Sequence, residues 1–121
     1  MKKTLLLSCT ILLVITAGCV QKTHKRTVTF TLDVSGMENI KSVGIRGWDN
    51  PLTWEKDHPL KEIVKDSLYQ ATITGETGRI CTEFKFTVNE KMELEGDENR
   101  KIYFDTTKDT TKALFVFNKK L

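Results

Sequence analysis

Histidine is scarce in this chain, whose 121 residues contain only His24 and His58. His24 lies in a polar segment near the N-terminus and His58 lies beside Pro59, so a histidine metal cluster or a Ser-His-Asp arrangement has too few parts. No glycine-rich loop that would cradle a phosphate is present, and no internal repeat is visible. We therefore predict no catalytic residue, no metal and no cofactor.

The N-terminus is predicted to be a secretory signal over residues 1–18. It begins with a basic segment, residues 1–3, and continues with an apolar run that is too short to span a bilayer comfortably. Small residues then lead directly to Cys19, as in a bacterial lipobox, although Thr16 stands where Leu or Val is commoner. This resemblance implies that Cys19 receives lipid and becomes the mature N-terminus, which would place the protein on a membrane of the cell envelope. The alternative is an ordinary signal that is cleaved nearby.

Removal of the signal leaves little net charge and no cysteine pair. The chain has nineteen Lys and Arg against sixteen Asp and Glu, and without Lys2 and Lys3 the balance is seventeen against sixteen, or +1 instead of +3. We therefore predict no nucleic-acid partner. With Cys9 removed and Cys19 lipidated, only Cys81 remains, so no intramolecular disulfide can form. Residues 19–26 are predicted to be a short tether, which is either simply solvated or attracted to anionic lipid headgroups.

Residues 27–121 are predicted to form one all-β domain, an antiparallel β-sandwich. Apolar residues alternate with threonines over residues 27–34, which is the period of a half-buried strand. Similar alternation recurs in short segments separated by turn residues, including a hairpin turn at residues 89–91, and this spacing favours a sandwich. Only residues 61–65 suggest another local structure, too short for a helix. We expect the core to include Phe30, Ile45, Tyr69, Phe84, Phe86, Phe104 and Val116.

One predicted strand has two faces of different chemistry. In residues 83–88 the apolar side chains Phe84, Phe86 and Val88 share one side, and Lys85 lies with polar neighbours on the other. We therefore expect Lys85 to point outward. Cys81 falls on the same side as Lys85 and is either a partly exposed thiol or a structural residue.

Two tryptophans in the segment 47–55 provide flat aromatic surfaces in a polar loop. A sugar ring has an apolar C–H face that stacks on an aromatic ring, and a rim of hydroxyls that binds amide, carboxylate and amine groups. Trp48 and Trp54 are therefore candidate carbohydrate-binding residues. The alternative is that a loop tryptophan folds inward and plugs the end of the sandwich.

The order of several short motifs resembles family 20 starch-binding domains and their family 48 glycogen-binding relatives. These motifs are Val43-Gly44-Ile45-Arg46-Gly47, Pro51-Leu52-Thr53-Trp54, Leu60, Tyr69-Gln70-Ala71-Thr72, Glu83-Phe84-Lys85-Phe86 and Glu95 to Arg100. The resemblance implies an immunoglobulin-like sandwich that binds α-glucan. By resemblance, Trp54 stacks on a sugar ring, Lys85 donates to its hydroxyls, Asn99 bonds the rim and Glu95 orients the loop.

The sequence departs from the family pattern at Leu94, which stands where the family usually has a second tryptophan. Losing one aromatic stack costs roughly 1–3 kcal/mol, by analogy with stacking of nucleic-acid bases. Trp48 compensates if its ring lies on the same face. The second glucan site of the family depends on exposed tyrosines, and because Tyr69 and Tyr103 are expected to face inward or to be held within strands, we predict no second site.

Two functions from different classes follow. The first is a non-catalytic, membrane-anchored lipoprotein that binds starch, glycogen or malto-oligosaccharides for separate glucan-processing enzymes. The second is an envelope lipoprotein that retains the sandwich, has lost sugar binding and binds a protein through an apolar surface at Leu94. Enzymatic use of carboxylate pairs such as Glu93 with Glu95 is not expected, because acids on a hairpin are usually only solvated.

Overall fold

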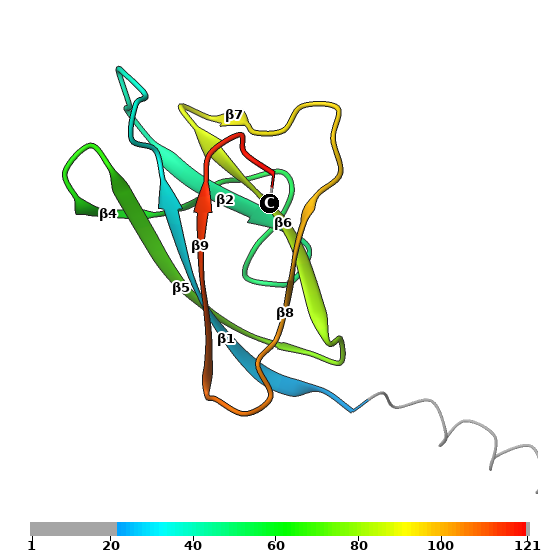
Figure 1. Cartoon of the computed structure of the whole chain (residues 1–121). Coiled ribbons are helices and arrows are strands. Elements are labelled where there is room, and N and C mark those ends of the chain that lie inside the picture. The colour runs from blue at the N-terminus through cyan, green and yellow to red at the C-terminus, as the bar shows by residue number, and fades with distance from the viewer. Residues whose placement is uncertain (1–21, 121) are drawn as a thin grey trace, which may run out of the picture.

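Two β-sheets pack face to face in the computed structural model, which describes residues 22–120 (Figure 1). Sheet A has the strand order β4 (Lys61–Val64), β5 (Leu68–Thr77), β1 (His24–Asp33) and β9 (Thr110–Val116). Sheet B contains β3 (His58–Pro59), β2 (Val43–Gly47), β6 (Cys81–Val88), β7 (Lys91–Met92) and β8 (Arg100–Tyr103). The predicted β-sandwich is confirmed. The predicted signal, residues 1–18, and Cys19 lie outside the described residues, and no helix of residues 22–120 is long and apolar enough to cross a membrane.

The strand pairs of sheet B and most of those in sheet A are antiparallel, as the turn spacing predicts. The exception is β1, which pairs with β5 in the antiparallel sense and with β9 in the parallel sense. The first and last strands of the domain are therefore neighbours. β1 begins at His24, so residues 24–26, which were predicted to belong to the tether, are part of the sheet.

The core lies between the sheets and is dominated by four phenylalanines. Phe30 of β1 and Phe115 of β9 meet Phe84 and Phe86 of β6, with ring centroids between 4.8 and 6.4 Å apart. The edge-to-face arrangement of most of these pairs adds to the free energy gained from their burial. Ile45 is also fully buried. The alternation of apolar and polar residues in β1, β2 and β6 thus identified these inward residues correctly.

Two other residues that were expected in the core lie at its margin, and for a third the prediction of burial is wrong. Tyr69 and Phe104 are half-buried and pack against the core. The Tyr69 hydroxyl donates to Glu62, and partial burial together with this bond raises the pKa of Tyr69. Val116 is 39% exposed on the outer face of β9, where Phe115 faces inward instead. Because β9 is apolar on both faces, its alternation does not show which side is buried.

Two local predictions can be compared directly with the strands. Asn89 and Glu90 have φ of 54° and 65° between β6 and β7, so the predicted hairpin turn is confirmed. The segment 61–65, for which another structure was considered, instead contains the short edge strand β4. Its residues are all exposed, which explains why they show no clear periodicity.

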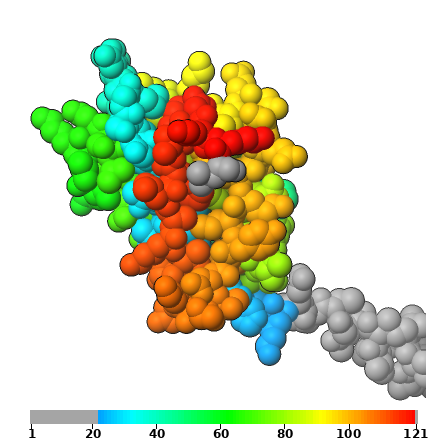
Figure 2. Space-filling model, viewed as in Figure 1, coloured from blue at the N-terminus to red at the C-terminus, as the bar shows by residue number. Residues whose placement is uncertain are grey.

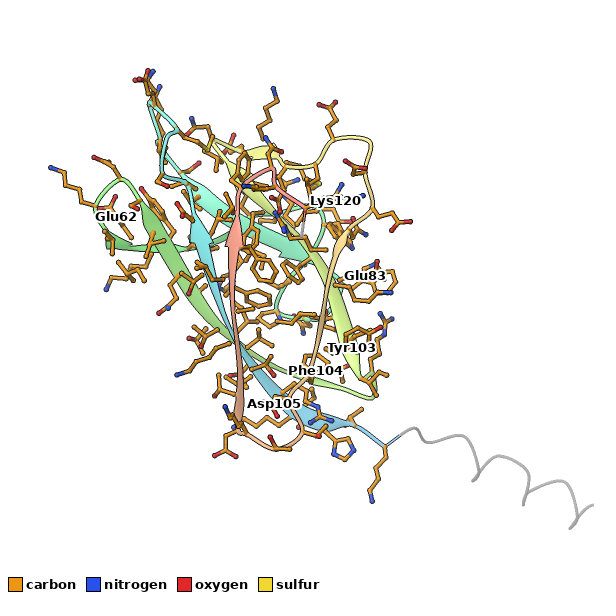
Figure 3. The ribbon with its side chains drawn as sticks, in the orientation of Figure 1. Glu62, Glu83, Tyr103, Phe104, Asp105 and Lys120 are labelled. Atoms are coloured by element: carbon orange, nitrogen blue, oxygen red, sulfur yellow. The ribbon has the colours of Figure 1, made fainter. Side chains whose placement is uncertain are left out.

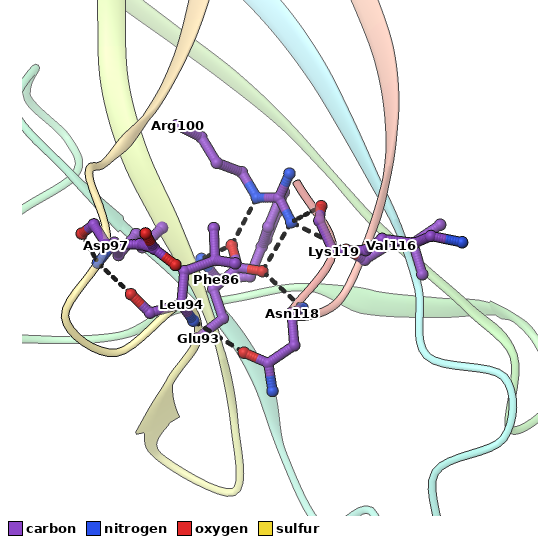
Figure 4. A network of polar contacts seen from close by, with 9 residues as sticks. Phe86, Glu93, Leu94, Asp97, Arg100, Val116, Asn118 and Lys119 are labelled. Carbon is purple, nitrogen blue, oxygen red and sulfur yellow. Dashed lines mark hydrogen bonds and ion pairs between the residues drawn. The ribbon is translucent and has the colours of Figure 1, made fainter. Parts of the chain in front are cut away.

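A buried ion pair ties the loop between β7 and β8 to the C-terminal segment (Figure 4). Arg100 Nε lies 2.7 Å from Glu93 Oε2, and the guanidinium also donates to the carbonyls of Val116 and Lys119 at 2.8 and 3.0 Å. Glu93 accepts further bonds from the backbone amides of Phe86 and Asn118. The network therefore connects β6 in sheet B with the segment that follows β9 in sheet A.

Candidate functional site

The surface of sheet B that faces away from sheet A carries the chemically interesting residues. Since opposite residues in an antiparallel pair share a face, the register places side chains in rows across this outer face. Arg46 lies opposite Lys85, and Glu83 lies opposite Lys101. Tyr103 lies opposite Cys81 in the next row. Cys81 and Lys85 thus share a face, as the sequence predicts.

One end of this outer face is covered by other parts of the chain. Thr87 is fully buried, and a side chain added at the neighbouring Gly44 would meet both Thr87 and Asp57 within 3.0 Å. Asp57 pairs with Arg46 at 2.6 Å, and the Arg46 guanidinium also donates to the Trp54 carbonyl at 3.2 Å. The segment around residues 54–57 therefore folds over the sheet and is fastened by Arg46.

Lys85 lies on the outer face of its strand, as predicted, but it is buried at the covered end of that face. Only 6% of the residue is exposed, and its Nζ donates to the carbonyls of Leu94 and Asp97 at 2.9 and 2.8 Å. An ammonium group has three donors, and two of them bind the loop between β7 and β8. Lys85 is on the predicted face of the strand, but its observed partner is the protein's own backbone.

We expect Lys85→Met to lower the free energy of unfolding by about 1.5–3 kcal/mol, because hydrogen bonds to a charged donor are lost and two carbonyls are left without it. Urea denaturation measures this change. Lys101→Met is the matched control: Lys101 is exposed on the adjacent strand, and its replacement should change stability by less than about 0.5 kcal/mol. An unchanged midpoint for Lys85→Met, accompanied by loss of sugar binding, would show instead that the ammonium serves a ligand.

The other end of the outer face is open and carries two exposed aromatic side chains. The Trp48 amide donates to the Glu83 carbonyl at 3.1 Å, which continues the β2–β6 ladder by one residue and places Trp48 opposite Glu83. Trp48 is 51% exposed and Tyr103 is 62% exposed. In Figure 3, Glu83 and Tyr103 lie on the same side of the molecule, on neighbouring strands. Tyr103 belongs to β8, as one of the two expectations had it, but it faces outward, so the expectation that it faces inward is wrong.

The Trp48 ring is held by a neighbouring cation and by an anchored loop. The Arg79 guanidinium lies over the ring, 4.5 Å from its centroid. Such a contact orients an aromatic side chain and is attractive through the ring quadrupole. In the loop that follows Trp48, the Asp49 carboxylate accepts a bond from the Thr82 hydroxyl at 2.6 Å, and Leu52 is buried in the core. Trp48 is thus presented by a fixed loop instead of plugging the sandwich.

The remaining predicted site residues do not converge on one place. Trp54 is half-buried. Glu95 is exposed beside a shallow cavity that Met92 and Asn118 also line. Asn99 lines a different cavity with Leu94, on the side where the β8 and β9 regions lie next to each other (Figure 2, orange and red). The structure therefore does not bring Glu95 and Asn99 to the same cavity.

Leu94 does not provide the exposed apolar surface that the protein-partner hypothesis expected. It is 7% exposed, its amide donates to the Asn118 side chain at 2.8 Å, and its φ is 50°. This left-handed backbone conformation is unusual for a leucine. Leu94 is consequently part of the loop structure that Lys85 fastens.

The sequence did not predict four residues of the open end as part of a site: Arg79, Glu83, Lys101 and Tyr103. For Tyr103 a signal was present, because it alternates with the inward Ile102 and the half-buried Phe104. Arg79 gives no comparable signal, since its contact with Trp48 depends on how two separate loops meet. Within residues 22–120, no group of His, Cys, Asp and Glu is suited to hold a metal ion.

Comparisons with known proteins give a fold relationship only. No protein-family model matches the chain, and no curated protein matches it. Among solved structures, it is similar to a glycoside hydrolase family 15 glucoamylase from Hypocrea jecorina, with a TM-score of 0.58 and 16% sequence identity. The match covers 84% of this chain and 18% of the glucoamylase chain. At this identity the similarity concerns the fold, shared with a small part of a much longer protein.

Proposed function

We propose that this domain is a non-catalytic carbohydrate-binding module for α-glucans, with its site at the open end of the outer face of sheet B. The observation that carries the proposal is the half-exposed Trp48 ring, oriented by Arg79 and placed beside Glu83. The fold similarity to part of a glucoamylase supports glucan as the ligand class.

The open end has the chemistry that a sugar requires. The Trp48 ring is suited to the apolar C–H face of a pyranose, and the Glu83 carboxylate and the Lys101 ammonium can exchange hydrogen bonds with its hydroxyls. Trp54, which was expected to stack on the sugar, is half-buried, and its backbone carbonyl accepts a bond from Arg46 at the covered end. We therefore assign the main stacking role to Trp48 and an auxiliary role, at the edge of the site, to Trp54.

Hydrolysis is not part of the proposal. Glycoside hydrolysis uses two carboxyl groups placed across the scissile bond. Glu93 and Glu95 are close in the sequence, but Glu93 is fully buried in its ion pair with Arg100, whereas Glu95 is exposed. These two acids lie in different environments, and Glu93 is already committed to protein contacts. A separate glucan-processing enzyme would therefore act on the bound chain.

We further propose that the module is anchored to a membrane of the cell envelope by lipid on Cys19. The support is the short apolar run followed by small residues and cysteine. Replacing Cys19 with alanine and fractionating the cells tests this part, because unchanged processing and unchanged membrane association would contradict it.

We expect Trp48→Ala to weaken binding of a long malto-oligosaccharide by about 5- to 100-fold, since one aromatic stack contributes roughly 1–3 kcal/mol. Isothermal titration calorimetry on residues 22–121 measures the affinity. Leu114→Ala serves as the control, because Leu114 is 57% exposed on the outer face of sheet A and should not affect the ligand. If the native domain binds no α-glucan at millimolar concentration, the proposal is wrong.

A protein ligand is the second candidate, and one observation favours it. Ile80 is 70% exposed, and its carbonyl accepts a bond from the Phe104 amide, which places Ile80 at the end of the β6–β8 pair, one residue beyond the Cys81–Tyr103 pair. An apolar side chain as exposed as Ile80 is suited to a contact with another protein. Ile80→Ser distinguishes the two functions, because it should disrupt a protein contact and leave glucan affinity unchanged.

A further inference from the structure

We propose that Tyr103 is a second aromatic platform, and that Trp48 and Tyr103 together select an extended oligosaccharide over a mono- or disaccharide. This inference rests on the proposed function and adds the size of the ligand and its direction across the sheet. It also differs from the separate tyrosine site of the starch-binding family, because it places Tyr103 in the same site as Trp48.

The strand register fixes how the two aromatic residues are related. Trp48 occupies one row with Glu83 and Lys101, on successive strands, and Tyr103 follows two residues after Lys101 on β8. Ideal strand spacing and rise place the Trp48 and Tyr103 backbones roughly 12 Å apart on the diagonal. A single small sugar cannot cover both rings over such a separation, whereas an oligosaccharide can lie across them.

The surface between the rings is polar and available to a ligand. Glu83 is half-buried, Lys101 is exposed, and no ion pair joins these two described residues. Carboxylate oxygens accept hydrogen bonds and an ammonium group donates them. Glu83 can therefore bind a sugar hydroxyl that donates, and Lys101 can bind one that accepts. Aromatic platforms separated by free charged groups fit a chain of hydroxylated rings better than they fit a continuous apolar protein surface.

The covered end of the sheet sets the direction in which the ligand extends. Lys85 lies in the row next to Glu83, and residues 94–97 close over it through two hydrogen bonds. An oligosaccharide stacked on Trp48 therefore extends toward β8 and Tyr103, since the opposite direction along β6 is blocked. Trp48 and Tyr103 are accordingly the two ends of one site and not two separate sites.

The test compares maltose with maltoheptaose by calorimetry on the native domain and on Tyr103→Ala. The native domain should bind maltoheptaose at least about tenfold more tightly, and Tyr103→Ala should lose about 5- to 100-fold in maltoheptaose affinity with little change for maltose. Tyr103→Phe keeps the ring and should retain the preference for the longer ligand. Tyr103 is exposed, so denaturation midpoints should match and exclude misfolding as the cause.

Different results would contradict the carbohydrate-binding function and the role of Tyr103. If the native domain binds neither sugar, the carbohydrate-binding function itself is wrong. If the native domain binds maltoheptaose and Trp48→Ala weakens that binding while Tyr103→Ala does not, the function stands and the role of Tyr103 is overturned. Equal losses for maltose and maltoheptaose in Tyr103→Ala would likewise contradict selection by chain length.

Discussion

Replacement of Arg100 with methionine is expected to lower the free energy of unfolding by about 3–5 kcal/mol, because it leaves a buried carboxylate without its cation. The Glu93 side chain is fully buried and that of Arg100 is 6% exposed. Methionine retains much of the apolar volume beside Phe86 and Phe115, whose rings the guanidinium contacts. The expected loss therefore comes mainly from the charge and from the bonds to the Val116 and Lys119 carbonyls.

A double replacement separates the charge effect from packing. Glu93→Gln with Arg100→Met removes both charges, and it should be less destabilising than the sum of the two single changes. Chemical denaturation of the four proteins completes the cycle. If Arg100→Met alone changes the midpoint no more than the exposed control Lys101→Met does, the ion pair does not support the fold as we infer.

Replacement of Phe86 with alanine is expected to cost about 3–5 kcal/mol, as is usual when a large aromatic side chain is removed from a core. Phe86 is fully buried, and its ring lies 5.5 Å from that of Phe84 and 5.6 Å from that of Phe115. Its neighbours come from both sheets, so the cavity cannot close without moving one sheet against the other. The midpoint in urea and the thermal transition both measure the effect.

The control for Phe86→Ala is Leu114→Ala, which removes an apolar side chain that is 57% exposed. This change should alter stability by about 0.5 kcal/mol or less. Similar midpoints for the two variants would mean that the inward face of β6 is assigned incorrectly.

Alternation with a period of two was sufficient to predict the longer strands and most of the core, but not the short strands β3, β4 and β7. Phe30, Phe84 and Phe86 alternate with polar neighbours, Ile45 lies between Gly44 and Arg46, and all four are buried between the sheets. The same rule failed for Val116, because in β9 apolar residues occupy both faces. Local pattern therefore decides burial only where the two faces of a strand differ.

The candidate site was less predictable because it depends on contacts between distant segments. Lys85 lies on the predicted face, but residues 94–97 return over it and take up its hydrogen-bonding capacity. Tyr103 is 62% exposed, because no comparable segment among residues 22–120 folds over its side chain. Alternation indicates on which face a side chain lies, and only the path of the loops determines whether that face meets solvent.

The parallel pairing of β1 with β9 has a consequence for how the chain acquires its structure. Residues 27–33 find their partners at residues 110–116, almost the whole length of the domain later. Contacts so distant in sequence carry a large loop-closure cost and slow folding. Sheet A also cannot be completed until β9 has been synthesised, so the edge of β1 that β9 covers stays unpaired while the intervening residues emerge.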